Sequence, residues 1–222
     1  LTSEQSPQIK NLLLNIANKR KAKIVELKDL SSEYKSGLYF QTKQQQNNLN
    51  LALNILNTLK IKPQQTQKVI NNFRMTCRQE IMQVNPLVVL DGAHNNDKLG
   101  NLVDFIKTLK YKKLHLILGL AADKNYQTAL KQILPLTHKL YLTRFLIIHR
   151  KTADLRQLAA DCKKVKNITT QIFHDPEQAL AAALKNAHKN DLIIIAGSFF
   201  LAGELRKHWI SEQYIIENLR TK

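Results

Sequence analysis

A short turn near the middle of the chain combines a carboxylate, an imidazole and an amide. Asp91, His94 and Asn95 come directly after the apolar run 87–90, with Gly92 inside the turn. The run is short, rich in valine and flanked by proline and glycine, which is typical of a buried strand. The apolar spacing over 96–109 predicts a helix. The turn therefore follows the carboxyl end of a strand, where open α/β sheets bind their ligands.

The elements that position this turn belong to a regular alternation that starts at residue 86. Strands are predicted at 87–91, 114–120, 138–143, 168–173 and 191–196. Helices are predicted at 96–109, 125–134, 152–163, 176–189 and 199–209. This alternation predicts an α/β fold with a mostly parallel, Rossmann-like sheet and helices on both faces. The tail at 213–216 is expected to form a last strand.

The first part of the chain lacks this regular alternation of strands and helices. Helices are predicted there at 6–20, 45–59 and 64–73, and short strands at 23–27, 38–41 and 78–84. This is too little sheet for a stable α/β domain. We therefore expect a boundary near residue 85, with an incomplete domain at 1–85 and a complete α/β domain at 86–222.

The composition narrows the class of protein. The chain has 222 residues, and its two cysteines, Cys77 and Cys162, lack the paired spacing of a metal site, which fits a reducing cytosol. Residues 1–10 are polar and unlike a signal peptide. No apolar run approaches the roughly 20 residues that span a bilayer. A cytoplasmic protein without a membrane partner is expected.

The net charge of +17 raises the question of a nucleic-acid partner. The lysines are scattered through the chain, and no basic patch is interleaved with aromatic residues. A solvated basic surface is the simpler interpretation, and nucleic acid is not expected as a partner. The charge instead favours anionic ligands such as nucleotides and carboxylates.

The turn also resembles a known family. The motif LDGAHN at 90–95 is similar to the C-terminal domain of folylpolyglutamate synthase/dihydrofolate synthase, within the Mur-ligase superfamily of ATP-dependent amide-forming ligases. Arg78, in TCRQEI, resembles the family's Gly-Arg segment, with Cys77 in place of the glycine. AGSFFLAGELRK at 196–207 resembles the family's ending, and LGLAADKNYQ at 118–127 resembles its strand and Asp-Lys-Asp loop.

A further match lies in the first part of the chain. Residues 42–48 resemble the family's Gly-x-His-Gln-x-x-Asn helix start: Gln45 and Asn48 match, whereas Thr42 and Gln44 replace the glycine and the histidine. The resemblance covers essentially the whole chain, in order and at compatible spacing.

The resemblance implies a role for each matching residue. Asp91 would accept hydrogen bonds from the ribose hydroxyls of ATP, Arg78 would contact its phosphates, and Asn48 would contact the adenine edge. His94 is implied as a catalytic residue that donates to a phosphate or to the carboxylate of the incoming glutamate. Ser198, at a helix start, is implied as a second glutamate contact.

Each of these residues also has a purely structural interpretation. Asp91 could stabilise its own turn, and Arg78 could be a surface arginine in a basic chain. Asn48, Asn95 and Ser198 could each do no more than cap a helix.

Several catalytic parts of this family are absent from the sequence. The six glycines do not form the G-x-x-x-x-G-K-[ST] phosphate loop. In the family, that loop and the Mg²⁺ ligands lie in the N-terminal region. The resemblance therefore implies the end of an ATPase domain followed by the C-terminal ligase domain, which we expect to be inactive alone. ATP and Mg²⁺ are the implied cofactors, and the partners are L-glutamate, folate or dihydropteroate, and the N-terminal ATPase domain.

The implied reaction forms an amide through an acyl phosphate made from ATP and a folate or pteroate carboxylate. Two alternatives remain open. One is a Mur-type ligase of cell-wall precursor synthesis, whose loop has the form Asp-Tyr-Ala-His-Asn-Pro. Gly92 favours the folate branch, while Asn96 in place of the proline fits neither. The other is a basic binding module without catalytic activity.

Overall fold

The computed structural model describes residues 6–25, 27–35, 37–61, 64–147 and 149–219. The chain divides into two compact units, Leu1–Phe73 and Arg74–Lys222. This division falls ahead of the boundary that the sequence predicts near residue 85. The reason is that β1 (Glu80–Val84) pairs antiparallel with β2 (Leu87–Leu90), so the hairpin belongs to the sheet of the second unit.

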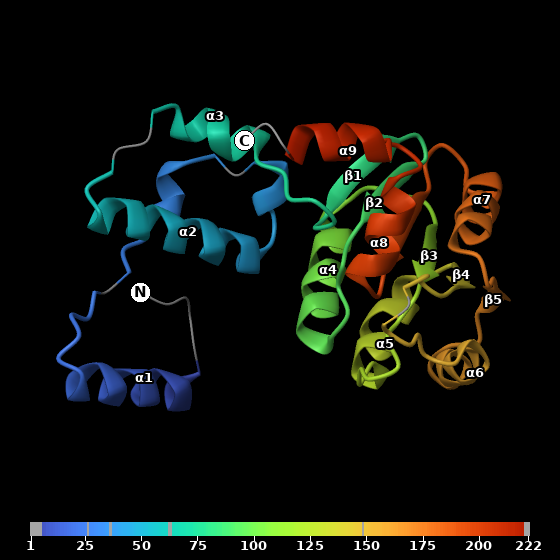
Figure 1. Ribbon diagram of the computed structural model, residues 1–222, viewed down its shortest axis with the longest axis horizontal. Helices are drawn as coiled ribbons and strands as arrows, with labels where there is room; N and C mark the ends of the chain where they lie inside the picture. Colours follow the sequence, from blue (N-terminus) through green and yellow to red (C-terminus); the bar gives the residue numbers. More distant parts are fainter. Residues whose placement is uncertain (1–5, 26, 36, 62–63, 148, 220–222) are drawn as a thin grey trace. The chain divides into compact units, whose positions relative to one another are not determined.

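The second unit is built on one six-stranded sheet with the order β1-β2-β6-β3-β4-β5 (Figure 1). The remaining strands are β3 (Leu114–Leu118), β4 (Lys139–Leu142), β5 (Thr169–Ile172) and β6 (Leu192–Ala196). All pairs except β1 with β2 are parallel. The predicted mostly parallel α/β sheet is confirmed, and each strand expected between residues 78 and 196 is present.

The central strand β6 places two chain segments side by side. Leu90 of β2 is paired with Ile195, and Leu118 of β3 is paired with Ala196. Because the strands are parallel, β2, β3 and β6 all end at the same edge of the sheet. The turn that follows β2 therefore lies beside the turn that follows β6.

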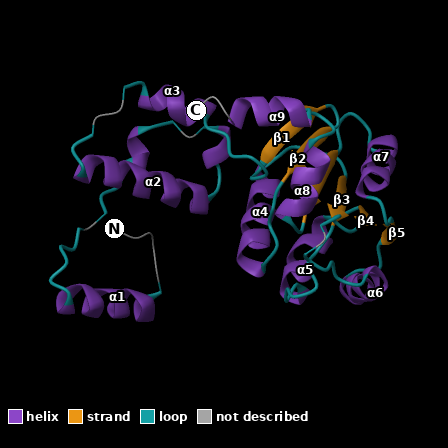
Figure 2. Ribbon diagram, viewed as in Figure 1, coloured by secondary structure: helices purple, strands orange, loops and turns teal. Residues whose placement is uncertain are grey.

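Helices cover both faces of this sheet (Figure 2). Val89, Leu116 and Ile194 face α4 (Asn96–Thr108), α5 (Gln127–Ile133) and α6 (Leu155–Val165) in one apolar core. The alternate residues Val88, Ile117 and Ile195 belong to a second core with α7 (Pro176–Asn186) and α8 (Phe199–Arg206). Since successive side chains of a strand point to opposite faces, continuous apolar strands require both layers.

The first unit is small and helical in its described part. It contains α1 (Pro7–Lys19), α2 (Lys43–Thr58) and α3 (Thr66–Asn72), with short 3₁₀ turns at Ser31–Glu33 and Leu38–Phe40. The strand predicted at 38–41 is wrong. Tyr39 and Phe40 are neighbours, yet both are buried in one cluster with Leu49, Leu53 and Ile70, which an alternating strand does not allow. The described residues of 23–27 form no strand either.

The tail is also helical, because α9 (Glu212–Leu219) replaces the strand predicted at 213–216. Ser211 accepts a hydrogen bond from the backbone N–H of Tyr214, and Gln213 donates to Glu217 one helical turn further on. This cap and this pair favour the helix over an edge strand. Within the described ranges, no helix is long and apolar enough to cross a membrane.

Candidate functional site

Two turns meet at the carboxyl edge of the sheet. The N–H of Asp91 donates to the carbonyl of Ile195 at 2.9 Å, and the N–H of Gly197 donates to the carbonyl of Ala93 at 2.8 Å. Gly197 has a φ of +104°, and a Cβ there would lie 2.6 Å from the carbonyl oxygen of Gly119. The glycine therefore lets the turn that carries Ser198 approach the end of β3 closely.

Asp91 lies beneath these turns and is only 4% exposed. Its Oδ1 accepts the N–H of Ala93 at 2.7 Å, and its Oδ2 accepts the N–H of Gln79 at 3.1 Å. Burial raises the pKa of this carboxyl to about 6, against the opposing effect of both N–H groups. The contacts of Asp91 therefore agree with its structural interpretation, in which it stabilises its own turn. The ribose contact stays a prediction.

The tight turn just before β1 contacts Asp91 and contains two residues in the left-handed conformation. Cys77 has a φ of +53° and Gln79 a φ of +50°, conformations that favour glycine. Cys77 stands where the resembling family has glycine, so the local backbone agrees with that pattern. The carbonyl of Cys77 accepts the N–H of Gly92 at 2.7 Å. Arg78 is thereby presented at the same edge as the turn 91–95.

Arg78 stacks on an aromatic ring from α8. Its guanidinium carbon lies 4.5 Å from the centroid of the Phe199 ring, a cation–π distance. The same ring covers Gly92, where an added Cβ would lie 2.3 Å from it. Gly92 is thus required by the close approach of Phe199.

His94 is held in one orientation by its own turn. Its Nδ1 lies 2.8 Å from the carbonyl oxygen of Gly92, which only accepts, so Nδ1 carries the proton. Its Nε2 lies 3.5 Å from Nζ of Lys98. Burial, followed by the positive charges of Lys98, Lys124 and Arg78, lowers the pKa of the imidazole. In this neutral form Nε2 is an acceptor, so the predicted donation to an anion requires a second proton.

Two predicted residues cap helices at this edge. Asn95 accepts the N–H of Lys98 at 3.0 Å and begins α4, as its structural interpretation held. Ser198 accepts the N–H of Phe200 at 3.0 Å and begins α8. The hydroxyl proton of Ser198 remains available for donation, and its contact with glutamate stays a prediction.

Asn48 belongs to the first unit. It is exposed within α2, where its side chain accepts from Gln44 at 3.2 Å and donates to Gln45 at 3.3 Å. A helix does start within 42–48, but the alternative that Asn48 caps it is wrong, because Thr42 is the N-cap. The adenine contact of Asn48 stays a prediction. Of the predicted site residues, Arg78, Asp91, His94 and Ser198 are brought together at one sheet edge.

Three residues near this edge were not identified from the sequence. Lys98 lies in the first turn of α4, four residues after His94, and its Nζ is 3.5 Å from Nε2 of His94. Lys124 follows β3 and is close enough to lower the pKa of His94. Phe199 follows Ser198 in the segment that resembles the family ending. The sequence spacing from His94 and the strand-end position were the available signals for the two lysines.

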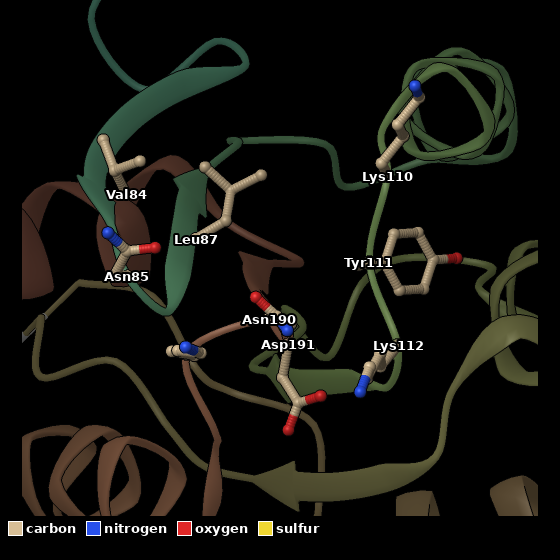
Figure 3. A pocket seen from close by; sticks show the side chains of 9 residues that line it. Val84, Asn85, Leu87, Lys110, Tyr111, Lys112, Asn190 and Asp191 are labelled. Atoms are coloured by element: carbon tan, nitrogen blue, oxygen red, sulfur yellow. The ribbon is translucent and has the colours of Figure 1, made fainter.

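A surface cavity of about 480 Å³ lies at the opposite, amino-terminal edge of the sheet (Figure 3). It is lined by Leu87 at the start of β2 and by Asp191 just before β6. The side chains of Lys110 and Lys112 point in different directions in this view. Asp191 is already engaged, since its Oδ2 accepts the N–H of His188 at 2.9 Å. The polar groups of this cavity do not converge on one ligand position.

The comparisons with known proteins agree with the geometry. A family model described as the Mur ligase, glutamate ligase domain matches residues 74–199. This match extends over more than half of the chain, and the chain therefore belongs to this family.

Two curated relatives carry related names. The chain is 31% identical over 132 residues to a probable bifunctional folylpolyglutamate synthase/dihydropteroate synthase of Halobacterium salinarum, covering 60% of this chain and 16% of that protein. It is 24% identical over 131 residues to the dihydrofolate synthase/folylpolyglutamate synthase of Bacillus subtilis, covering 59% of this chain and 29% of that protein. The matched region thus spans less than a third of either relative.

A solved structure shows the same fold. The folylpolyglutamate synthase of Mycobacterium tuberculosis, complexed with ADP and AMPPCP, superposes with a TM-score of 0.76 at 17% identity. The superposition covers 95% of this chain and 55% of that one. The whole-chain likeness agrees with the resemblance seen along the full sequence.

Proposed function

We propose that this chain forms the nucleotide- and glutamate-binding part of an ATP-dependent ligase that adds L-glutamate to folates or to dihydropteroate. The observation that carries this proposal is the set of basic groups at the carboxyl edge of the sheet. Lys98 lies 3.5 Å from His94, and the charges of Arg78 and Lys124 also act on the pKa of this imidazole, in a domain of the glutamate ligase family. Such a set suits the phosphates of a nucleotide.

The proposed reaction has two steps. A folate or pteroate carboxylate attacks the terminal phosphorus of ATP, which gives an acyl phosphate and releases ADP. The free amine of glutamate then attacks the acyl carbon, the C–O bond to phosphate breaks, and the nitrogen loses a proton as the amide forms. Catalysis comes from positioning and from neutralising the phosphate charge.

Each named residue has one part in this proposal. Arg78 contacts the phosphates of ATP, Asp91 the ribose and Asn48 the adenine. His94 and Ser198 receive the carboxylate of glutamate, and His94 faces the reacting phosphate. The side chains of Asp91 and Ser198 keep their structural hydrogen bonds in these roles, because carboxylate and hydroxyl oxygens have further bonding capacity.

Mg²⁺ is a proposed cofactor that the described residues do not fit. Within the described part of the chain, no three His, Cys, Asp or Glu side chains gather as a metal site. We assign its ligands, and the phosphate loop, to an ATPase domain that this region meets in the family. The chain alone is therefore expected not to catalyse ligation.

Calorimetric titration with ADP tests the proposed function. The wild-type chain should bind ADP weakly, and Arg78→Ala should weaken binding about tenfold or more, since a hydrogen bond to a charged group contributes about 1.5–3 kcal/mol. Arg156→Ala, an exposed arginine of α6, is the matched control and should bind as the wild type does. Equal binding by the two arginine variants would contradict the assignment.

An activity assay tests the expectation of inactivity. The chain alone, given ATP, Mg²⁺, glutamate and tetrahydrofolate, should release no ADP above background. Ligation by the chain alone would overturn the proposal that a further ATPase domain is needed.

A further inference from the structure

Three basic side chains from separate elements lie near the imidazole of His94, and two of them, Arg78 and Lys98, also lie 4.5 and 6.0 Å from the centroid of the Phe199 ring. Lys98 comes from α4, Lys124 from the loop after β3, and Arg78 from the turn before β1. Each of these side chains is half-buried. Burial, followed by the charges of Arg78 and Lys124, lowers the pKa of the Lys98 ammonium against the opposing charge of Asp91. Positive charges held this close together repel one another unless an anion lies between them.

The carboxylates near this cluster are already engaged. Asp91 lies beneath it, and each of its oxygens accepts a backbone N–H. Asp123 is paired with Arg150 at 3.0 Å and with Lys124 at 3.4 Å, on the exposed side of the loop. Among the described residues, neither carboxylate forms an ion pair or a hydrogen bond with Lys98 or Arg78. The cluster is therefore suited to an external oxyanion.

The protonation of His94 is linked to the occupancy of this cluster. Nδ1–H is committed to the carbonyl of Gly92, so a second proton enters only at Nε2. Nε2 lies 3.5 Å from Lys98 Nζ and accepts from it when the imidazole is neutral. An oxyanion among these groups neutralises the cations that disfavour the imidazolium.

We propose that Lys98 and Lys124 complete an oxyanion site with Arg78 and His94, and that a bound phosphate group makes His94 take up one proton from solvent. Nε2 then changes from an acceptor facing Lys98 to a donor facing the oxyanion, and Lys98 also becomes free to donate to it. The inference rests on the proposed function for the source of the phosphate, a nucleotide or the acyl phosphate. The charged groups near His94 are Lys98, Lys124 and Arg78, and the uncharged ring of Phe199 lies 6.0 Å from the imidazole.

NMR of the imidazole rings tests this linkage directly, with inorganic pyrophosphate as the probe. The His94 resonance is assigned by its loss in His94→Gln, and its pKa is measured with and without pyrophosphate. In the wild type, pyrophosphate should raise the pKa of His94 by about one pH unit or more, as expected for an opposite charge within bonding distance. The effect should weaken as salt is added.

Two lysine variants of α4 distinguish binding at this site from a general effect of net charge. Lys98→Met should weaken pyrophosphate binding by roughly fivefold or more and reduce the change at His94. Lys107→Met removes the same charge from the exposed end of the helix, where Lys107 lies 3.9 Å from Asp104, and should behave as the wild type. An equal loss of pyrophosphate affinity in both variants would mean that only the net charge of the chain matters, and it would overturn the inference.

The remaining outcomes distinguish this inference from the proposed function. Absent pyrophosphate binding, or binding that leaves the pKa of His94 unchanged, overturns the inference even where ADP binds. Pyrophosphate binding with proton uptake, combined with ADP that binds no more tightly than pyrophosphate, supports the oxyanion site and contradicts the nucleotide assignment.

Discussion

The guanidinium of Arg78 lies 4.5 Å from the centre of the Phe199 ring. The arginine comes from the turn before β1, and the phenylalanine from the first position of α8. The contact therefore orients a proposed phosphate-binding group from a separate element of the sheet edge.

Replacing Phe199 should weaken nucleotide binding without unfolding the domain. Phe199→Leu removes the ring, and ADP affinity should fall about twofold to fivefold, which corresponds to a cation–π contribution of about 0.5–1 kcal/mol. Phe199→Tyr keeps the ring and should retain the affinity. Phe200→Leu, which lies away from Arg78 and faces Arg150 at 5.9 Å, serves as the control. Equal ADP affinities for Phe199→Leu and Phe199→Tyr would contradict the role of the Phe199 ring in orienting Arg78.

Gly92 should tolerate no side chain while Phe199 is present. Gly92→Ala places a Cβ 2.3 Å from the ring and should destabilise the domain by about 1–3 kcal/mol in denaturant unfolding. The double variant with Phe199→Ala should recover part of this loss, because the two residues are in contact. Gly203→Ala, with no atom within 4 Å of the new Cβ, should be neutral or stabilising by up to about 1 kcal/mol. Additive losses in the double variant would contradict the steric account.

The pair formed by Glu80 and Arg206 should anchor the turn that presents Arg78. The two side chains are 13% and 15% exposed and are bonded at 2.9–3.0 Å, while Glu80 also accepts the N–H of Cys77 at 2.8 Å. Arg206→Met leaves a buried carboxylate without its partner and should cost about 3–5 kcal/mol of unfolding free energy.

The double variant Arg206→Met with Glu80→Gln should regain much of that loss, because no charge is then left unpaired. Lys207→Met, which breaks an exposed pair with Glu212, should change stability by less than about 1 kcal/mol. A loss of similar size at Arg206 and Lys207 would mean that burial has no special effect at this pair.

The ionisation of Asp91 should make the domain less stable as the pH rises. Burial raises the pKa of its carboxyl from 3.8 to about 6, so the folded state binds more protons than the unfolded state between these values. The stabilisation is therefore complete below about pH 4 and is lost as the pH rises through about 6. Relative to Asp91→Asn, the wild type should lose roughly 2–3 kcal/mol across this window in denaturant unfolding. A difference in unfolding free energy between the two proteins that does not change with pH would contradict the raised pKa of Asp91.

The sheet could be predicted from the sequence because its signals are local. The apolar strands and the helix-spaced segments after residue 86 each carry their own periodicity, and the order of the elements then fixes parallel pairing. The local signals failed where tertiary contacts decide the conformation. The aromatic cluster of Tyr39 and Phe40 overrides the strand expected at 38–41, and the cap at Ser211 begins a helix where a strand was predicted.

The site was predicted in part for the same reason. Asp91, His94 and Ser198 follow strands that end at one edge, so their proximity follows from topology. The hydrogen bond that Asp91 accepts from Gln79 could not be predicted, because it depends on the left-handed residues of the preceding turn. The proton position on His94 likewise depends on a contact with the Gly92 carbonyl, for which the sequence carries no signal.

We propose that a nucleotide binds at the carboxyl edge of the sheet in the second unit. Titrating the isotope-labelled chain with ADP and following the backbone amide shifts would locate its binding site. The largest changes are expected at 77–79, 91–98, 124 and 197–200. Changes centred instead on the opposite cavity, at 84–87, 110–112 and 189–191, would contradict it.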